Sequence, residues 1–204
     1  QQEIDALPLI DRKEANVLAS KLKRWLSFNK VDIHKFQLLE SSDWELSWEQ
    51  DTTSLYYRTF EPKIDDVYFP EMHDYSPDRT MYVKLLESAV AYVENDTLKY
   101  FGGDDCQEIH LVSRKHKTDV MLEWLGVSSF MEECVWLDNS RFVLMGVNGY
   151  SDYEQFVIYL YDVQNKKKIT YFYQDRNRLF EDNKIEEWYF TDYNLPNRGL
   201  PLLH

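Results

Sequence analysis

Two stretches of this sequence share one plan: Tyr75-Ser76-Pro77-Asp78-Arg79-Thr80-Met81-Tyr82-Val83 and Trp136-Leu137-Asp138-Asn139-Ser140-Arg141-Phe142-Val143-Leu144. Each places an aromatic residue before a tight turn that contains Asp and then enters a run of strand-forming residues. Asp, Asn, Ser and Pro favour such turns because they hydrogen-bond the local backbone or fix φ. The repetition predicts a duplicated unit of β-structure.

The segments that follow the two turns predict strands in the same order. In the first unit, 71–126, we expect strands at 81–86, 109–112 and 120–122, with an inserted pair at 89–93 and 98–101. In the second unit, 131–178, we expect strands at 142–145, 156–161 and 169–173. A polar turn with lysines precedes the last strand of each unit. Antiparallel meanders, one of them with an insertion, fit both units.

This pattern resembles the blades of β-propellers of the broad TolB and WD40-like type. The residues that carry the resemblance are Tyr75 to Tyr82 and Ile158 to Ile169, with counterparts at Trp136 to Val143 and Ile109 to Val120. They cover roughly half the chain, at about 50 to 60 residues per unit. A propeller closes with four to eight blades, and only two are visible in the sequence. We therefore expect a mainly β protein in which blade-like antiparallel meanders form an open sheet or a sandwich.

An amphipathic helix is predicted at 11–29, before the repeated units. Asp11 and Glu14 have the spacing of a capping box, with Asp11 as the N-cap and Glu14 reaching back to it. Apolar residues then recur at three- and four-residue steps, at Ala15, Leu18, Leu22, Trp25 and Leu26. This single apolar stripe must be buried, and we expect it to lie on or beside the sheet.

Three further segments complete a single domain over 1–204. Asp43 to Glu49 alternates polar and apolar residues, which predicts a strand with Trp44, Leu46 and Trp48 on one face. A C-terminal strand and tail are expected over 184–204, with the strand at 185–190 and a loop after it. The polar stretch 175–183 indicates a loop or a short helix.

The composition limits the class of partner. The chain has 204 residues, of which 44% are hydrophobic and 16% aromatic, and a formal net charge of −13. Nucleic acids and anionic membrane surfaces need cationic groups, so neither is an expected partner. No stretch approaches the roughly 20 apolar residues that span a bilayer, so no integral membrane segment is expected. The acidic surface indicates solubility or a basic partner.

The chain starts at Gln1 without an initiator Met, which we interpret as a processed form. A removed secretory signal or a trimmed domain edge would each explain this start. A periplasmic or extracellular location is therefore expected, and a cytoplasmic one stays open. Cys106 and Cys134 would form one disulfide in such a location, or remain two half-buried thiols.

No motif for catalysis, metal binding or cofactor binding stands out, and no cofactor is expected. The adjacent acid pairs are interpreted as solvated surface, since strand neighbours point to opposite faces. Asp104-Asp105 would give calcium too few ligands and is interpreted as a turn. His110 and His116 flank a predicted turn and could face each other across a hairpin, but two ligands do not make a transition-metal site.

Aromatic residues are the remaining candidates for binding. Most are expected in the core, because alternating aromatics are typical of half-buried strands. Tyr150, Asp152 and Tyr153 are the candidate interaction residues, in a loop with Gly146 and Gly149 nearby. The sequence favours a non-catalytic secreted or periplasmic module that binds a protein or a carbohydrate. The alternatives are an acidic inhibitor or immunity-type protein with a basic partner, and a hydrolase-like domain with an unrecognised site.

Overall fold

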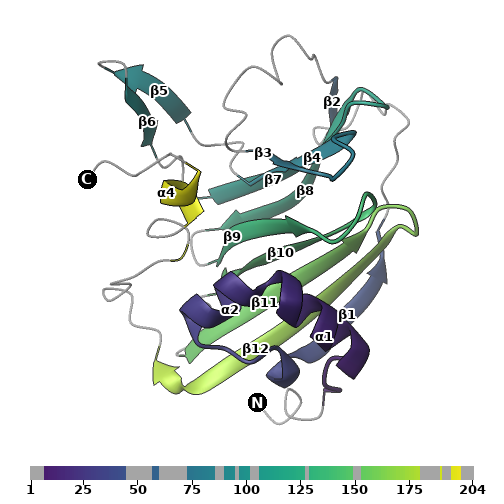
Figure 1. Ribbon diagram of the computed structural model, residues 1–204, viewed down its shortest axis with the longest axis vertical. Helices are drawn as coiled ribbons and strands as arrows, with labels where there is room; N and C mark the ends of the chain where they lie inside the picture. The colour runs from purple at the N-terminus through teal and green to yellow at the C-terminus, as the bar shows by residue number, and fades with distance from the viewer. Residues whose placement is uncertain are drawn as a thin grey trace.

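The described residues form two five-stranded antiparallel sheets and a separate two-stranded hairpin (Figure 1). The computed structural model describes residues 7–44, 57–59, 73–85, 90–94, 97–101, 106–126, 129–148, 153–179, 189 and 194–198. Sheet A has the order β1 (Gln37–Asp43), β12 (Lys167–Leu179), β11 (Tyr153–Asp162), β10 (Arg141–Asn148) and β9 (Ser129–Trp136). Sheet B has the order β2 (Tyr57–Thr59), β8 (Thr118–Gly126), β7 (Cys106–Ser113), β4 (Met81–Lys84) and β3 (His73–Tyr75).

Both sheets are built in the same way. Each is a four-stranded meander whose last strand pairs with a strand from earlier in the chain, β1 on β12 and β2 on β8. The hairpin of β5 (Val90–Glu94) and β6 (Thr97–Phe101) is inserted in the chain between β4 and β7, which pair with each other. Among the described residues it has no counterpart in sheet A. The predicted mainly β fold of antiparallel meanders, one with an insertion, is confirmed. Within the described ranges the sheets close into neither a barrel nor a propeller.

The first core lies between the two sheets. Because side chains alternate along a strand, each sheet offers one set of apolar residues to the other. Sheet B contributes Val83, Ile109, Leu111 and Val120, and sheet A contributes Phe142, Leu144, Tyr161 and Phe172. The other face of sheet B carries a second set of residues that are also buried, and these form the candidate site below.

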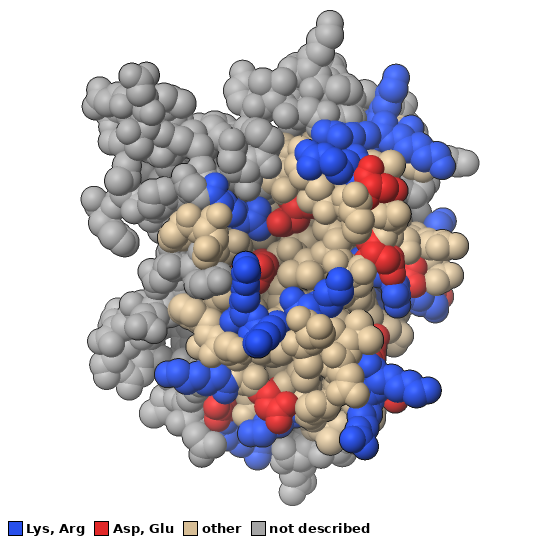
Figure 2. Space-filling model, in the orientation of Figure 1, with Lys and Arg blue, Asp and Glu red and all other residues tan. Residues whose placement is uncertain are grey.

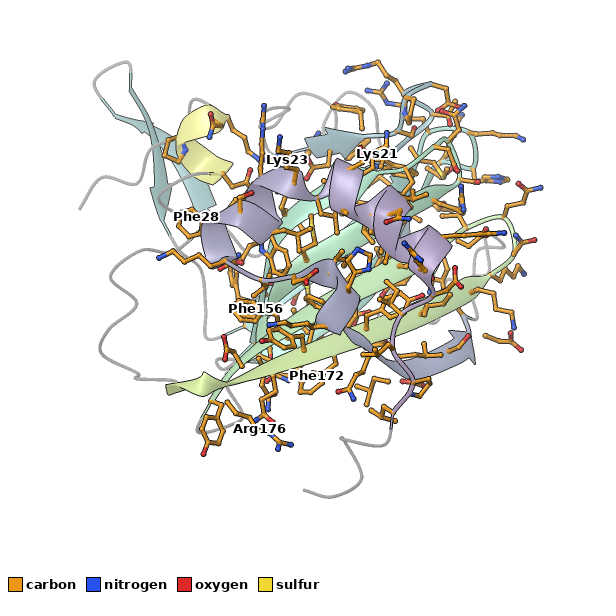
Figure 3. The ribbon with its side chains drawn as sticks, turned by 60° about the horizontal axis from the view of Figure 1, so that its bottom comes forward. Lys21, Lys23, Phe28, Phe156, Phe172 and Arg176 are labelled. Atoms are coloured by element: carbon orange, nitrogen blue, oxygen red, sulfur yellow. The ribbon has the colours of Figure 1, made fainter. Side chains whose placement is uncertain are left out.

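The helices form a third layer on the far face of sheet A (Figure 1). α1 (Arg12–Lys21) and α2 (Lys23–Asn29) bury Leu18 and Trp25 against strand residues such as Ile158. Figure 3 shows Phe156 close to α2, whereas Phe172 belongs to the core on the opposite side of the sheet. The predicted amphipathic stripe is therefore buried on sheet A. None of the helices in the described part of the chain has the length and apolar sequence that a membrane crossing needs.

The helix prediction needs two corrections. Asp11 caps α1 by accepting from the backbone N–H groups of Lys13 and Glu14, but Glu14 accepts a hydrogen bond from the Tyr171 hydroxyl of β12. The helix is also interrupted at Leu22, where φ is −98° and ψ is 13°. Neither glycine nor proline occurs there, so no local signal marks the break. The end near residue 29 is confirmed, with Lys30 in the left-handed conformation.

Several strand boundaries also differ from the predictions. A strand was expected at 43–49, but the observed strand β1 ends at Asp43 and Trp44 is not part of it. Residues 45–49 lie outside the described ranges. β12 continues through Asp175 to Leu179, where a loop or a short helix was expected, because Asp175 and Leu179 pair with the start of β11. Of the C-terminal strand only Tyr189 is described, and it lies in a helical turn. Leu195–Asn197 forms the short helix α4 instead of a loop.

Gly146 lies inside β10 and not in the adjoining loop. It sits at a register shift between β9 and β10, where it pairs with Met131. A β-carbon at this position would lie 2.0 Å from the backbone oxygen of Phe130. Only glycine permits this approach of the two strands.

Candidate functional site

The aspartates of the repeated turns are structural. Oδ1 of Asp78 accepts from the hydroxyl of Ser76 and from the backbone N–H of Thr80. In the second turn, Oδ1 of Asp138 accepts from the backbone N–H groups of Ser140 and Arg141. These bonds lower the pKa of both carboxyls, and in Asp138 they outweigh burial, which alone would raise it. The aspartates are therefore occupied with stabilising their own turns.

A charged cluster lies on the second face of sheet B, in positions that the sequence did not reveal as neighbours. Asp119 of β8 has its two oxygens 2.7 Å from Nζ of Lys84 and 2.7 Å from Nδ1 of His110. Lys84 and His110 are paired across β4 and β7. All three residues are buried, and Asp119 is 0% exposed. A buried charge of this kind is stable only with close partners of opposite sign.

The electrostatics of this cluster keep Asp119 ionised. Burial by itself raises the pKa of the Asp119 carboxyl. The hydrogen bonds and positive charges of His110 and Lys84 outweigh burial, so that the pKa is held well below its ordinary value. An ionised carboxylate only accepts hydrogen bonds, so Nδ1 of His110 carries the proton that lies between them.

His73 extends the cluster along β3. Its ring stacks on Tyr82, with 4.3 Å between centroids and an interplanar angle of 20°. Burial, followed by the charges of Lys84 and Arg114, lowers the pKa of His73 from 6.5 to about 4. His73 is therefore neutral at neutral pH.

One polar atom of the cluster has no hydrogen-bond partner among the described residues. Nε2 of His110 is buried without a hydrogen-bond partner there, and the nearest carboxylate oxygen, from Glu108, is 3.7 Å away. A His–Asp pair of this kind orients a base in hydrolases, but a nucleophile must lie within reach of the ring. None of the contacts described for His110 involves a serine, threonine or cysteine. No group of three His, Cys, Asp or Glu residues suited to a metal occurs in the described ranges either.

The sequence contained a weak signal for this cluster. Lys84 and Asp119 are charged residues inside otherwise apolar strands, where an unpaired charge is costly. Only the strand order and the register of Lys84 opposite His110 bring them together. Sequence reasoning considered His110 with His116 instead. His116 lies in the exposed turn after β7, whereas His110 is buried and contacts Asp119. The two histidines therefore do not face each other as the sequence suggested.

Beyond His73, the row of packed aromatic rings reaches the surface at the half-buried Tyr75. The centroids of Tyr82 and Tyr75 are 5.1 Å apart. The guanidinium carbon of Arg79 lies 4.0 Å from the Tyr75 centroid, and that of Arg114 lies 5.1 Å from it. Arg114 also donates from Nη1 to the backbone oxygen of Arg79, at 3.2 Å. Two cations are thus fixed around one aromatic ring.

These arginines belong to two neighbouring turns, 76–80 and 114–117, which we name the basic turn pair. The backbone N–H of Arg114 donates to Thr80, at 3.0 Å, and joins the turns. Besides the arginines, the pair carries the exposed Lys115 and Lys117, and its acidic residue is Asp78. Figure 2 shows basic side chains gathered over this end of sheet B. The basic turn pair thus carries four Lys and Arg residues and one acid, in a chain of net charge −13.

The predicted interaction residues are only partly covered by the structure. Tyr150 and Asp152 lie outside the described ranges, and Tyr153 is the partly exposed first residue of β11. Trp44 packs against the core, 5.0 Å from Tyr161, as expected for a core aromatic. No disulfide joins Cys106 and Cys134. Asp104-Asp105 and Trp48 also lie outside the described ranges.

Comparison with protein-family models, with curated proteins and with solved structures gives no match for this chain. Its function therefore rests on the geometry described above.

Proposed function

We propose that this protein is a non-catalytic binding module that holds an acidic segment of a partner protein at the basic turn pair. The observation that carries this proposal is the pair of guanidinium groups fixed around Tyr75. Arg79 and Arg114 are held 4.0 and 5.1 Å from the same ring. Two like charges in such proximity favour an anion that contacts both, and guanidinium groups match carboxylates in shape.

The buried cluster supports binding more than catalysis. Both oxygens of Asp119 are engaged, and Lys84 and His110 are buried beside it. Such a network fixes the pairing of β4, β7 and β8. β4 begins directly after the turn 76–80, and β7 ends directly before the turn 114–117. The cluster therefore serves to hold the turns in position.

The charge of the whole chain restricts the partner to a short anionic segment. Electrostatic interactions between exposed charges fade beyond about 8 Å at physiological ionic strength. A few carboxylates on one peptide segment would meet only the cations of the basic turn pair. A long polyanion would run onto the remaining surface of a chain with net charge −13 and be repelled.

Binding of a labelled hexaglutamate peptide, measured by fluorescence anisotropy, tests the proposal. The variant Arg79→Gln/Lys115→Gln/Lys117→Gln should weaken binding by about tenfold or more. The matched control Lys13→Gln/Lys21→Gln/Lys23→Gln removes the same charge from exposed positions on or beside the helices and should change it by less than about twofold. Equal losses in the two variants, or no binding by the wild type, would contradict the proposal.

The same experiment separates the alternative of an acidic inhibitor with a basic partner. If that alternative holds, the protein should bind a hexalysine peptide. The turn variant should then bind this peptide more tightly than the wild type, because it lacks the positive charges that repel the peptide. A secreted or periplasmic location is also part of our proposal. A cleavable signal peptide encoded ahead of Gln1 would support it.

A hydrolase-like role remains the second candidate because of the His110–Asp119 pair, in which Nε2 is uncommitted among the described residues. Hydrolysis of p-nitrophenyl acetate that His110→Gln abolishes, with folding intact, would favour it over the binding role. Hydrolysis at the same rate in both proteins would reject it.

A further inference from the structure

A hollow of about 330 Å³ lies beside the outer strand β1, where β12 and the short 3₁₀ helix Ile33–Lys35 meet the N-terminal segment. Its lining residues are Leu9, His34, Lys35, Gln37, Tyr173, Gln174 and Arg176. We propose that this hollow binds a small organic anion, with the anionic group on its basic side and an aromatic or apolar body on Tyr173 and Leu9. The site goes beyond the proposed function, because none of its residues belongs to the basic turn pair.

The basic side combines residues from two separate elements. His34 and Lys35 come from the 3₁₀ helix, and Arg176 comes from β12. Asp32 caps that helix by accepting from the backbone N–H of His34, at 3.0 Å. This cap fixes the backbone from which the His34 and Lys35 side chains extend. None of the described lining residues is an acid, although the chain as a whole is acidic. The positive charges of Lys35 and Arg176 therefore attract an anion to this side of the hollow.

The apolar side is held in place by the sheet. Tyr173 packs against Phe36 and Phe156, with centroids 5.7 and 6.3 Å away. Leu9 is 62% exposed, and its segment is fixed along β1 by a bridge to Gln37. The N–H of Leu38 also donates to the backbone oxygen of Pro8, at 2.7 Å. Because this backbone is held by β1, the exposed Leu9 side chain is kept at the rim of the hollow.

The size and lining fit a ligand with one ring and one anionic group. Small-molecule sites begin at about 300 Å³ and combine apolar walls with a few polar groups that fix orientation. Lys35 lies 5.9 Å from the centroid of Tyr173, so the charged and the aromatic parts of the site are adjacent. Gln37 and Gln174 add amide side chains to the wall, and Nε2 of Gln37 donates to the backbone oxygen of Leu7, at 3.4 Å.

Isothermal titration calorimetry on the full chain tests the inference with four probes. Phenyl phosphate and benzoate should bind, and whichever binds more tightly identifies the preferred anionic group. Inorganic phosphate lacks the ring and benzyl alcohol lacks the charge, so each should bind at least about tenfold more weakly. Inorganic phosphate binding as tightly as phenyl phosphate would overturn the proposal, as would no binding of either aromatic anion at millimolar concentration.

Variants place the binding at this hollow. Lys35→Gln and Arg176→Gln should each weaken phenyl phosphate binding by about tenfold, because each removes a charge-assisted contact. Lys21→Gln and Lys23→Gln are matched controls on the helices, away from Arg176 (Figure 3), and should change it by less than about twofold. Equal losses in the controls would overturn the assignment. An unchanged thermal unfolding midpoint verifies that each variant is folded.

Discussion

The side-chain oxygen of Asn139 accepts a hydrogen bond from the backbone N–H of Asp78, at 3.0 Å. The two residues belong to the two copies of the repeated turn and are 61 positions apart in the chain. A second contact joins the same region, where Nε1 of Trp136 donates to the backbone oxygen of Asp74, at 2.7 Å. The repeated turns therefore meet each other and link the edges of sheets A and B.

Asn139→Ala removes the link between the two turns. Because the bond is exposed, we expect a loss of about 0.5 kcal/mol in the free energy of unfolding. Urea denaturation measures this loss. Gln164→Ala, in the exposed turn after β11, is the matched control and should have no measurable effect. A loss of the same size in both variants would show that the link does not stabilise the fold.

Gly146→Ala introduces a steric conflict between β9 and β10. The added β-carbon would lie 2.0 Å from the Phe130 oxygen and 2.7 Å from the Met131 α-carbon, and both atoms belong to the backbone. The strands must separate, so we expect a loss of about 3 kcal/mol or more in urea denaturation. Val147→Ala, which adds no atom, should cost about 1 kcal/mol. Similar values for the two variants would mean that the strands adjust freely.

The pKa of His73 makes stability fall in mild acid. The unfolded side chain titrates near 6.5, and the folded one at about 4, because burial and Lys84 disfavour the charged ring. Between these values the unfolded chain binds a proton that the native state does not, so stability is lost as pH decreases. From pH 6.5 to 5 the expected loss is about 1.5 kcal/mol. In His73→Phe, which retains a ring beside Tyr82, this part of the pH dependence should disappear, and an unchanged slope would contradict the account.

The buried ion pair of Lys84 and Asp119 should show strong coupling. Lys84→Met and Asp119→Asn each leave one group without its partner, so each should cost about 3 to 5 kcal/mol. The double variant removes both charges and should cost less than the sum of the single variants. Urea denaturation of the four proteins measures the coupling, with Lys115→Met as an exposed control that changes stability by about 0.5 kcal/mol or less. Additive losses would show that the pair is not coupled.

Local sequence signals predicted the parts of the fold that depend on neighbours in the chain. The Asp78 and Asp138 turns, the strands after them and the cap at Asp11 follow from turn chemistry, alternation and helix capping. Polar strand ends were harder to predict. The β12 residues 175–178 are polar, and the strand continues through them because Asp175 and Leu179 pair with β11.

The candidate sites depend on register and could not be predicted. Lys84, His110 and Asp119 come from three strands, and nothing in the order of residues shows that they meet. The arginines around Tyr75 likewise come from two turns joined by the bond of Arg114 to Thr80. In both cases the sequence supplied the residue types, and tertiary pairing determined their neighbours.

An amide-resolved NMR titration with the hexaglutamate peptide tests the central claim most directly, because it locates the bound peptide on the protein. Our account predicts that the largest shifts occur at Arg79, Thr80 and 114–117 and that they decrease as salt is added. Shifts concentrated on α1 and α2, or spread evenly over the chain, would contradict it.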